Sequence, residues 1–195
     1  MTVTATSRYG AGEAPGGLLL VQDLANTIPH PRPPVGSDLL SDAATATDWL
    51  AEAGGRWCAV HGLARPVPTV TDDDLSAARL LRHRIRRLLG AEGPQERTGP
   101  AMAADVRIEV TPGHATVEPL GTGVGWLASA VAAECLLSRC LGVWTRLKIC
   151  RNTACGVVFY DRSRNSSGVW HDVSVCGNAA NVRAFRARRT AGKPR

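Results

Sequence analysis

The sequence predicts a mainly α-helical protein with one β-hairpin, in which a helical N-terminal domain precedes a small C-terminal zinc finger. Three observations support this fold class. Apolar residues recur at helical spacing over several long stretches, they alternate with polar residues in one stretch only, and three of the six cysteines gather near the C-terminus. At 195 residues, the chain has room for one domain of ordinary size with a small appendage.

Amphipathic or apolar stretches predict four helices before the cysteine-rich segment. The best-marked one follows Thr71, a capping residue, and opens with aspartates that complement the positive end of the helix dipole. Another is expected to begin at a Ser37 cap and to end at Gly54 and Gly55. The last is apolar around most of its circumference, which is typical of a central buried helix. The predicted helices span residues 17–28, 37–53, 71–90 and 123–144.

The pattern changes to strict alternation in one stretch. Val106, Ile108 and Val110 alternate with polar residues, and Pro112 and Gly113 then supply a turn. Alternation resumes after the turn, so the sequence predicts a β-hairpin at about residues 106–120.

We divide the chain into a disordered leader, a helical domain, a zinc finger and a basic tail. The leader has neither the basic start nor the apolar core of a signal peptide, and no apolar run is long enough to cross a membrane. We therefore expect a cytoplasmic protein with no membrane partner, in which Cys58, Cys135 and Cys140 are reduced core thiols. The four parts span residues 1–17, 18–144, 145–190 and 191–195.

Positive charge is concentrated at the C-terminal end. The net charge is +6, but residues 144–195 hold 11 Lys and Arg against 2 Asp and Glu, a local charge of +9. The rest of the chain is slightly acidic. Such asymmetry predicts a polyanionic partner for the C-terminal segment, although a solvated basic terminus would have the same composition.

Four side chains near the C-terminus have the order and spacing of zinc ligands. Four residues separate Cys150 from Cys155, fifteen separate Cys155 from His171, and four separate His171 from Cys176. Thiolate and imidazole ligands favour zinc, and a short segment needs the free energy of metal binding to fold. Four protein ligands leave no open coordination position, so we expect one structural zinc ion and identify no catalytic residue.

Two alternatives at this cluster remain open. The cysteines could be free thiols, with Cys150 and Cys155 as a redox pair. If His171 were not a ligand, three thiolates would leave an open position of the kind that catalytic zinc sites use, and Asp172 could then orient the imidazole.

The residues around these ligands resemble the CGNR zinc finger. Two cysteines precede a run that contains Phe and Asp at the family's spacing, and a Cys-Gly-Asn triplet follows a tryptophan. Three features depart from the family pattern: His171 replaces a cysteine, Ala179 replaces the arginine of the family name, and Gly168 with Val169 stands where relatives often carry arginine. The matching positions are Gly156, Phe159, Asp161, Ser163, Arg164, Trp170, His171, Cys176, Gly177 and Asn178.

The N-terminal body resembles the usual companion of that finger, the ABATE domain, which often begins with an apolar stretch ending in Asn-Thr. Leu24, Ala25, Asn26 and Thr27 match this pattern. The resemblance implies a bacterial, stress-type transcriptional regulator of the cytoplasm whose finger binds duplex DNA.

A helix after Cys176 with a basic tail is expected to contact DNA. Arginine forks suit phosphate oxygens and the guanine edge, and five phosphate contacts would give a slope of about −4.5 in log affinity against log salt. The candidate contacts are Arg162, Arg164, Arg183, Arg186, Arg188 and Arg189.

The helical body offers a weaker candidate site for a small acidic effector. Polar residues of the predicted helix 71–90 and of the Asn-Thr pair would meet between helices. A solvated helix face would explain the same residues. The candidates are Asn26, Thr27, Arg79, Arg82 and His83.

Three functions are compatible with these observations. The first is a zinc-dependent, DNA-binding transcriptional regulator whose N-terminal domain senses a ligand or dimerises. The second is a binding module without DNA, in which zinc is a structural clip. The third is an enzyme on the same scaffold, although no nucleophile with its base, phosphate loop or carboxylate pair stands out. Whether an effector is bound, and whether the chain forms a homodimer, stays open.

Overall fold

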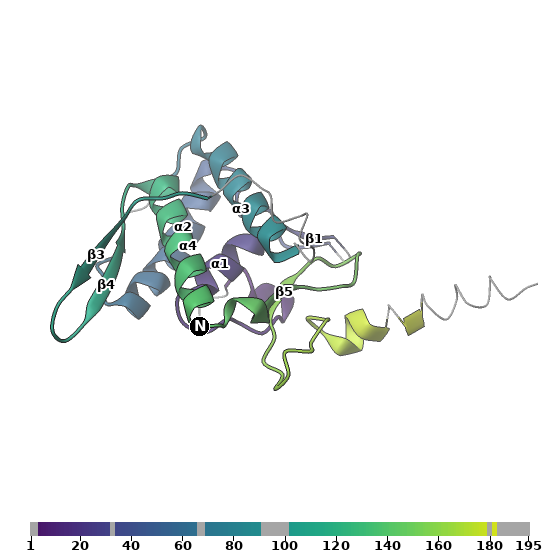
Figure 1. Cartoon of the computed structure of the whole chain (residues 1–195). Coiled ribbons are helices and arrows are strands. Elements are labelled where there is room, and N and C mark those ends of the chain that lie inside the picture. The colour runs from purple at the N-terminus through teal and green to yellow at the C-terminus, as the bar shows by residue number, and fades with distance from the viewer. Residues whose placement is uncertain (1–3, 32–33, 66–68, 91–101, 179–180, 183–195) are drawn as a thin grey trace, which may run out of the picture.

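The computed structural model describes residues 4–31, 34–65, 69–90, 102–178 and 181–182. Within these ranges the chain is mainly helical and ends in a small unit that carries the cysteine cluster (Figure 1). No helix in the described ranges combines the length and the apolar composition that a membrane crossing requires. The elements are η1 (Ser7–Tyr9), α1 (Leu18–Ala25), β1 (His30–Pro31), β2 (Pro34–Val35), α2 (Ala43–His61), α3 (Asp74–Gly90), β3 (Val106–Val110), β4 (Ala115–Pro119), α4 (Gly123–Cys140), η3 (Trp144–Arg146), β5 (Leu147–Ile149), β6 (Val158–Tyr160) and η4 (Val173–Gly177).

Helix α1 lies at the centre of the fold. It packs against α2, α3 and α4, and Val21, Leu24 and Ala25 have no exposed surface (Figure 1). Burial of apolar side chains on every side is the main stabilising term for such a helix. Two polar residues of α1, Gln22 and Asp23, are equally buried and therefore need hydrogen-bond partners from other segments.

The N-terminal segment, residues 4–17, supplies some of these partners, so the expectation of a disordered leader is wrong for it. The amide of Thr6 donates to Asp23 at 2.9 Å, and the amide of Ala14 donates to the Gln22 side chain at 2.6 Å. Ala5, Ala11 and Ala14 are buried as well. Small side chains let this segment lie directly against α1, and its backbone donors satisfy buried acceptors that would otherwise be costly.

Helix α2 begins and ends later than the sequence predicted. Its cap is Asp42, which accepts a hydrogen bond from the Thr45 amide at 2.8 Å, and not Ser37. Gly54 and Gly55 lie inside the helix and are buried, and a Cβ on Gly55 would come within 2.4 Å of the Arg65 guanidinium. Gly55 is therefore an interior position of α2 and does not terminate the helix.

Two other predicted helices have the expected type, but each differs from the prediction at one end. Helix α3 begins at Asp74 and is described up to Gly90, where this described range ends. Thr71 donates its hydroxyl and its amide to Asp74 in the turn that precedes the helix. Helix α4 ends at Cys140 because Gly142 adopts a left-handed conformation with φ of 70°. Cys140 is exposed, so the expectation that it is a core thiol is wrong, whereas Cys58 and Cys135 are buried.

The predicted hairpin is present as strands β3 and β4. The two strands pair in antiparallel register, with Ile108 opposite Val117, and project from the side of α4 (Figure 1). A shorter hairpin, β5 with β6, lies beside α3 near α1 and begins the C-terminal unit.

Strand β6 joins two separate hydrophobic clusters. Val158 has no exposed surface and packs into the main helical core, whereas Val157 and Phe159 pack with Cys150, Cys155 and Cys176 in a second cluster. Successive residues of a strand point to opposite faces, so this short strand lies between the helical body and the cysteine-bearing unit.

Candidate metal centre

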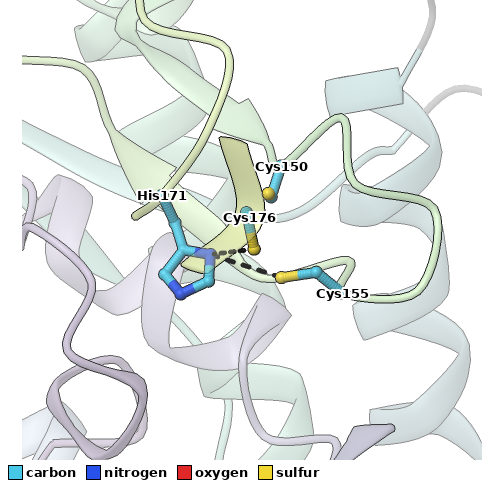
Figure 2. Close-up of side chains that lie close together, drawn as sticks. All are labelled: Cys150, Cys155, His171 and Cys176. Atoms are coloured by element: carbon cyan, nitrogen blue, oxygen red, sulfur yellow. Dashed lines mark hydrogen bonds between the residues drawn. The ribbon is translucent and has the colours of Figure 1, made fainter. Parts of the chain in front are cut away.

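Four predicted ligands converge at one point of the C-terminal unit. The sulfur atoms of Cys150, Cys155 and Cys176 and a ring nitrogen of His171 all lie within 4.8 Å of one another. His171 directs Nδ1 at Cys155, 3.3 Å away, and at Cys176, 3.5 Å away (Figure 2). For zinc bonds of about 2.3 Å to sulfur and about 2.05 Å to nitrogen, a tetrahedron gives S···N separations of about 3.6 Å. The cluster therefore has the dimensions of a tetrahedral zinc site.

The first two ligands are positioned by the loop between β5 and β6. The amide of Cys150 donates to the Val157 carbonyl, and the amide of Cys155 donates to the Asn152 carbonyl at 2.7 Å. Gly156 then turns the chain with a φ of 75°, a conformation that glycine adopts without strain. The Val157 amide points back at the Cys155 sulfur at 3.4 Å, which favours the thiolate form that a metal binds.

The second pair of ligands sits on a capped helical turn. The Asp172 carboxylate accepts hydrogen bonds from the Val175 amide and from the Ser174 hydroxyl, so it caps η4. This turn brings Cys176 back toward His171. The hydrogen bonds of the Asp172 carboxylate thus go to the capped turn, whereas the sequence suggested that it could orient the His171 imidazole.

Three sulfur atoms this close together cannot all be charged without a cation. The Cys155 thiol hydrogen-bonds the Cys150 sulfur, which lowers the pKa of Cys150 and raises the pKa of Cys155. Burial raises the pKa of Cys176. A divalent cation removes the repulsion between thiolates, so metal binding at this cluster is expected to release protons.

The donor set fits one ion in a structural role. Three thiolates and a neutral imidazole select zinc over magnesium or calcium, and together with Zn²⁺ they carry a net charge of −1. Cys150, Cys155 and Cys176 are buried. Because all four tetrahedral positions are taken by side chains, the site offers no place for a reacting water.

The loop that follows β6 is organised by a buried carboxylate. Asp161 accepts hydrogen bonds from Lys148 at 2.7 Å, from the Ser163 amide at 2.9 Å and from the Gly168 amide at 2.7 Å. Burial alone would raise the pKa of Asp161, but these hydrogen bonds outweigh it and hold the pKa well below its usual range. The loop that carries Arg162 and Arg164 is thereby closed at both ends.

Two family models match the chain. The model of the ABATE domain, described as "Putative stress-induced transcription regulator", matches residues 19–143, which is more than half of the chain. The chain belongs to the ABATE family. A second model, the CGNR zinc finger, matches residues 146–189 and includes all four converging ligands. Comparison with curated proteins gave no significant match.

The two matches confirm the predicted architecture, an ABATE domain followed by a CGNR zinc finger with one structural zinc ion. The described part of the finger, residues 146–178, is called the zinc module below. The chain is therefore a zinc-binding member of the family described as "Putative stress-induced transcription regulator".

Hydrogen bonds from three side chains join the ABATE domain to the zinc module, and the sequence did not predict this role for them. The Asn26 side chain accepts a hydrogen bond from the Val158 amide at 2.9 Å and donates one to the Val158 carbonyl at 2.8 Å. Gln22 donates to the same carbonyl at 3.1 Å. Arg86 donates to the carbonyls of Ala25 and Gly156 at 2.8 and 2.7 Å. Arg86 thus connects the end of α1 with the loop that holds the first two zinc ligands.

The residues considered for an effector site make structural contacts within the ABATE domain. Thr27 donates to the Leu24 carbonyl and accepts from Arg82, which also pairs with Asp38 at 2.6 Å. Arg79 donates to two backbone carbonyls, and His83 is exposed. Polar groups of four candidates therefore have hydrogen-bond partners within the protein: Asn26, Thr27, Arg79 and Arg82. Effector binding at these residues stays a prediction.

A cavity of about 370 Å³ lies elsewhere in the ABATE domain. It is bounded by the end of β4, by α2 and by the start of α4, with Cys58, Pro119 and Trp126 in its wall. It shares no lining residue with the effector candidates of the sequence.

Only part of the predicted DNA-contacting set lies in the described chain. Arg162 and Arg164 are exposed on the loop closed by Asp161, and Arg162 donates to the Glu13 carbonyl at 2.8 Å. Ala179 and the tail residues 191–195 lie outside the described residues, as do four candidates: Arg183, Arg186, Arg188 and Arg189.

Proposed function

We propose that the chain is a transcription regulator that binds duplex DNA through its zinc module and the basic segment after it. The observation that carries the proposal is the concentration of positive charge in the zinc module and in the segment that follows it in the sequence. Residues 144–195 have a net charge of +9, while the preceding residues are slightly acidic. A surface of this kind attracts a polyanion and orients the protein on it.

The zinc ion has a supporting part in this proposal. It fixes the loop between β5 and β6 against η4, and so holds the loop with Arg162 and Arg164 in one arrangement. Arginine forks that are held in place contact phosphate oxygens with a smaller loss of side-chain entropy than mobile ones. These contacts supply affinity, while base readout requires further side chains in a groove.

The ABATE domain has the regulatory part in this proposal, through ligand sensing or dimerisation. Support comes from its attachment to the zinc module: Asn26 and Arg86 connect the two through buried or half-buried hydrogen bonds. A change in the packing around α1 would therefore reach the loop that carries the first two ligands.

Binding to a labelled duplex, measured by fluorescence anisotropy over a series of salt concentrations, tests the proposal. Five phosphate contacts predict a slope of about −4.5 in log affinity against log salt, and each lost contact reduces its magnitude by about 0.9. Replacement of Arg162 and Arg164 by alanine should reduce the magnitude by about 1.8. Arg65→Ala, which removes an exposed arginine from the loop after α2, should leave the slope unchanged.

Two outcomes would contradict the proposal. A zinc-loaded, folded protein with no affinity for duplex DNA at low salt would exclude it. A slope that falls equally in the double variant and in Arg65→Ala would show that charge alone, and not the zinc module, attracts the nucleic acid.

A further inference from the structure

The hairpin β3–β4 has an apolar face that the described residues cover only at its base. Val106 and Val117 are half-buried and Pro119 is buried, but Ile108 is 61% exposed and Val110 is 76% exposed. All five side chains lie on one face of the ribbon, because strand residues alternate between faces. A two-stranded ribbon is marginally stable in water on its own, so a further strand at its edge would stabilise it.

The outer edge of β3 also carries backbone groups that point away from β4. The Leu120 amide donates to the Asp105 carbonyl, and the Thr111 amide donates to the His114 carbonyl. Hydrogen-bonded pairs alternate along an antiparallel ladder, so the odd-numbered residues of β3 bond to β4. The N–H and C=O groups of Val106, Ile108 and Val110 therefore face outward. Within the described ranges the sheet has only these two strands.

Of the two edges of the ribbon, that of β3 is better suited to pairing. On β4 the outward-facing residues include Pro119, which has no N–H to donate, and β4 is the strand that packs more closely on α4. Strand β3 contains no proline, glycine or lysine, the residues that commonly prevent edge pairing. In Figure 1 the ribbon stands away from the helices, at the opposite side of the ABATE domain from β5.

We propose that β3 pairs in antiparallel fashion with β3 of a second copy of this chain, about a two-fold axis at Ile108. In this register Val106 lies opposite the second copy's Val110, and Ile108 lies opposite its equivalent. On the other face, Arg107 lies opposite the second copy's Glu109. Because of the two-fold symmetry, Glu109 also lies opposite the second copy's Arg107. Cross-strand pairs of opposite charge and of branched apolar residues are both stabilising.

The neighbouring symmetric registers are unfavourable. A shift of the axis to residue 107 places Arg107 opposite its own equivalent, and a shift to residue 109 does the same for Glu109. Like charges directly opposite are destabilising, and each shift leaves one outward-facing residue of β3 unpaired. The order Val-Arg-Ile-Glu-Val is thus self-complementary in one register.

This pairing also gives the exposed tip of the hairpin a neighbouring strand. An antiparallel arrangement places the tip of each hairpin beside the base of the other, where the helical body begins. Val110, the most exposed apolar residue of the ribbon, would then contact the second copy's Val106, and the four strands would share one apolar face.

Complementary charge reversals test the pairing on the full-length, zinc-loaded protein. Wild type should be a dimer in analytical ultracentrifugation. Glu109→Lys places two positive charges opposite each other at both symmetry-related pairs with Arg107, and should raise the dimer dissociation constant by about tenfold or more. Thr116→Lys changes the residue opposite Glu109 on β4 and should leave the dimer intact. An equimolar mixture of Glu109→Lys with Arg107→Glu should dimerise again, because both cross-strand pairs of the heterodimer then join opposite charges. In one pair the introduced lysine faces the introduced glutamate, and in the other the unchanged Arg107 faces the unchanged Glu109.

The possible results separate clearly. A wild type that is monomeric at the highest soluble concentration overturns the proposal, and so does a dimer that tolerates Glu109→Lys. A mixture that stays monomeric while both variants keep the wild-type circular dichroism spectrum also overturns it. Because Arg107 pairs with Glu118 inside the hairpin, Arg107→Glu could fail to fold. In that event Glu109→Lys against Thr116→Lys decides the question.

Discussion

The side chain of Asn26 pairs with the backbone of Val158 in both directions, as a neighbouring β-strand would. Its amide donates to the Val158 carbonyl and its carbonyl accepts from the Val158 amide, and both residues are buried. The hydrogen bonds of β6 are thus completed by a residue just after α1. Consequently, the ABATE domain and the zinc module are expected to fold as one cooperative unit.

Replacement of Asn26 by alanine should destabilise the whole protein. The substitution leaves the Val158 amide buried without a partner and removes one of two donors to its carbonyl. At about 1–3 kcal/mol for each unsatisfied buried group, we expect a loss of about 2–4 kcal/mol in the free energy of unfolding. Urea unfolding with zinc present measures it. Asn165→Ala, at an exposed position of the zinc module, is the matched control and should change the value by less than about 0.5 kcal/mol.

Zinc removal should weaken the ABATE domain as well as the zinc module. If the zinc module folded independently, chelation would unfold it and spare the helical body. The contacts of Gln22 and Asn26 with Val158 predict a wider effect, because these two buried side chains lose hydrogen-bond partners once β6 unfolds. Hydrogen exchange before and after chelation should show lost protection in α1. Protection in α1 that survives chelation unchanged would show that the two parts fold independently.

Arg86→Lys should lower stability and speed the loss of zinc. Lysine keeps the charge but cannot reach the carbonyls of Ala25 and Gly156 together, as the guanidinium does. Burial lowers the pKa of Arg86 and also keeps water from replacing a lost hydrogen bond. We therefore expect the free energy of unfolding to fall by about 1.5–3 kcal/mol. Arg87→Lys, an exposed change at the next position of α3, is the control. Zinc release to a coloured chelator gives the rate, and equal rates for both variants would contradict the role assigned to Arg86.

Gly168→Ala should destabilise the arginine-bearing loop. A Cβ at this position would lie 2.8 Å from the carboxylate carbon of Asp161, and that carboxylate is held by three hydrogen bonds. Overpacking of this kind costs about 1–3 kcal/mol. Gly125→Ala in α4 meets no atom within 4 Å and should be neutral or slightly stabilising. Thermal unfolding of the two variants should therefore shift in opposite directions or by clearly different amounts.

The sequence predicted the features whose signals are local. The spacing of Cys150, Cys155, His171 and Cys176 identified the ligand set, because a small zinc site needs ligand pairs at short intervals. Alternation from Val106 to Val110 identified the hairpin. Aspartates that complement the helix dipole, followed by apolar residues at helical spacing, identified α3.

Features that depend on tertiary packing escaped prediction. The partner of Asn26 lies 132 positions away in the chain. From the sequence alone, the Asn-Thr pair is equally consistent with a ligand site and with a structural contact. The N-terminal segment has the small and flexible residues of a disordered leader, and only the buried acceptors of α1 show why it is ordered. Gly55 resembles a helix stop but lies inside α2, which continues to His61.

Zinc stoichiometry and unfolding temperature of the wild type, His171→Ala and His171→Cys test the central claim most directly. A closed Cys₃His site predicts one zinc ion per chain in the wild type, weaker zinc binding and a lower unfolding temperature in His171→Ala, and recovery of both in His171→Cys. One zinc ion that is bound equally well by His171→Ala would contradict the account. In that case the fourth coordination position would be open, and the zinc module would have to be considered as a catalytic centre.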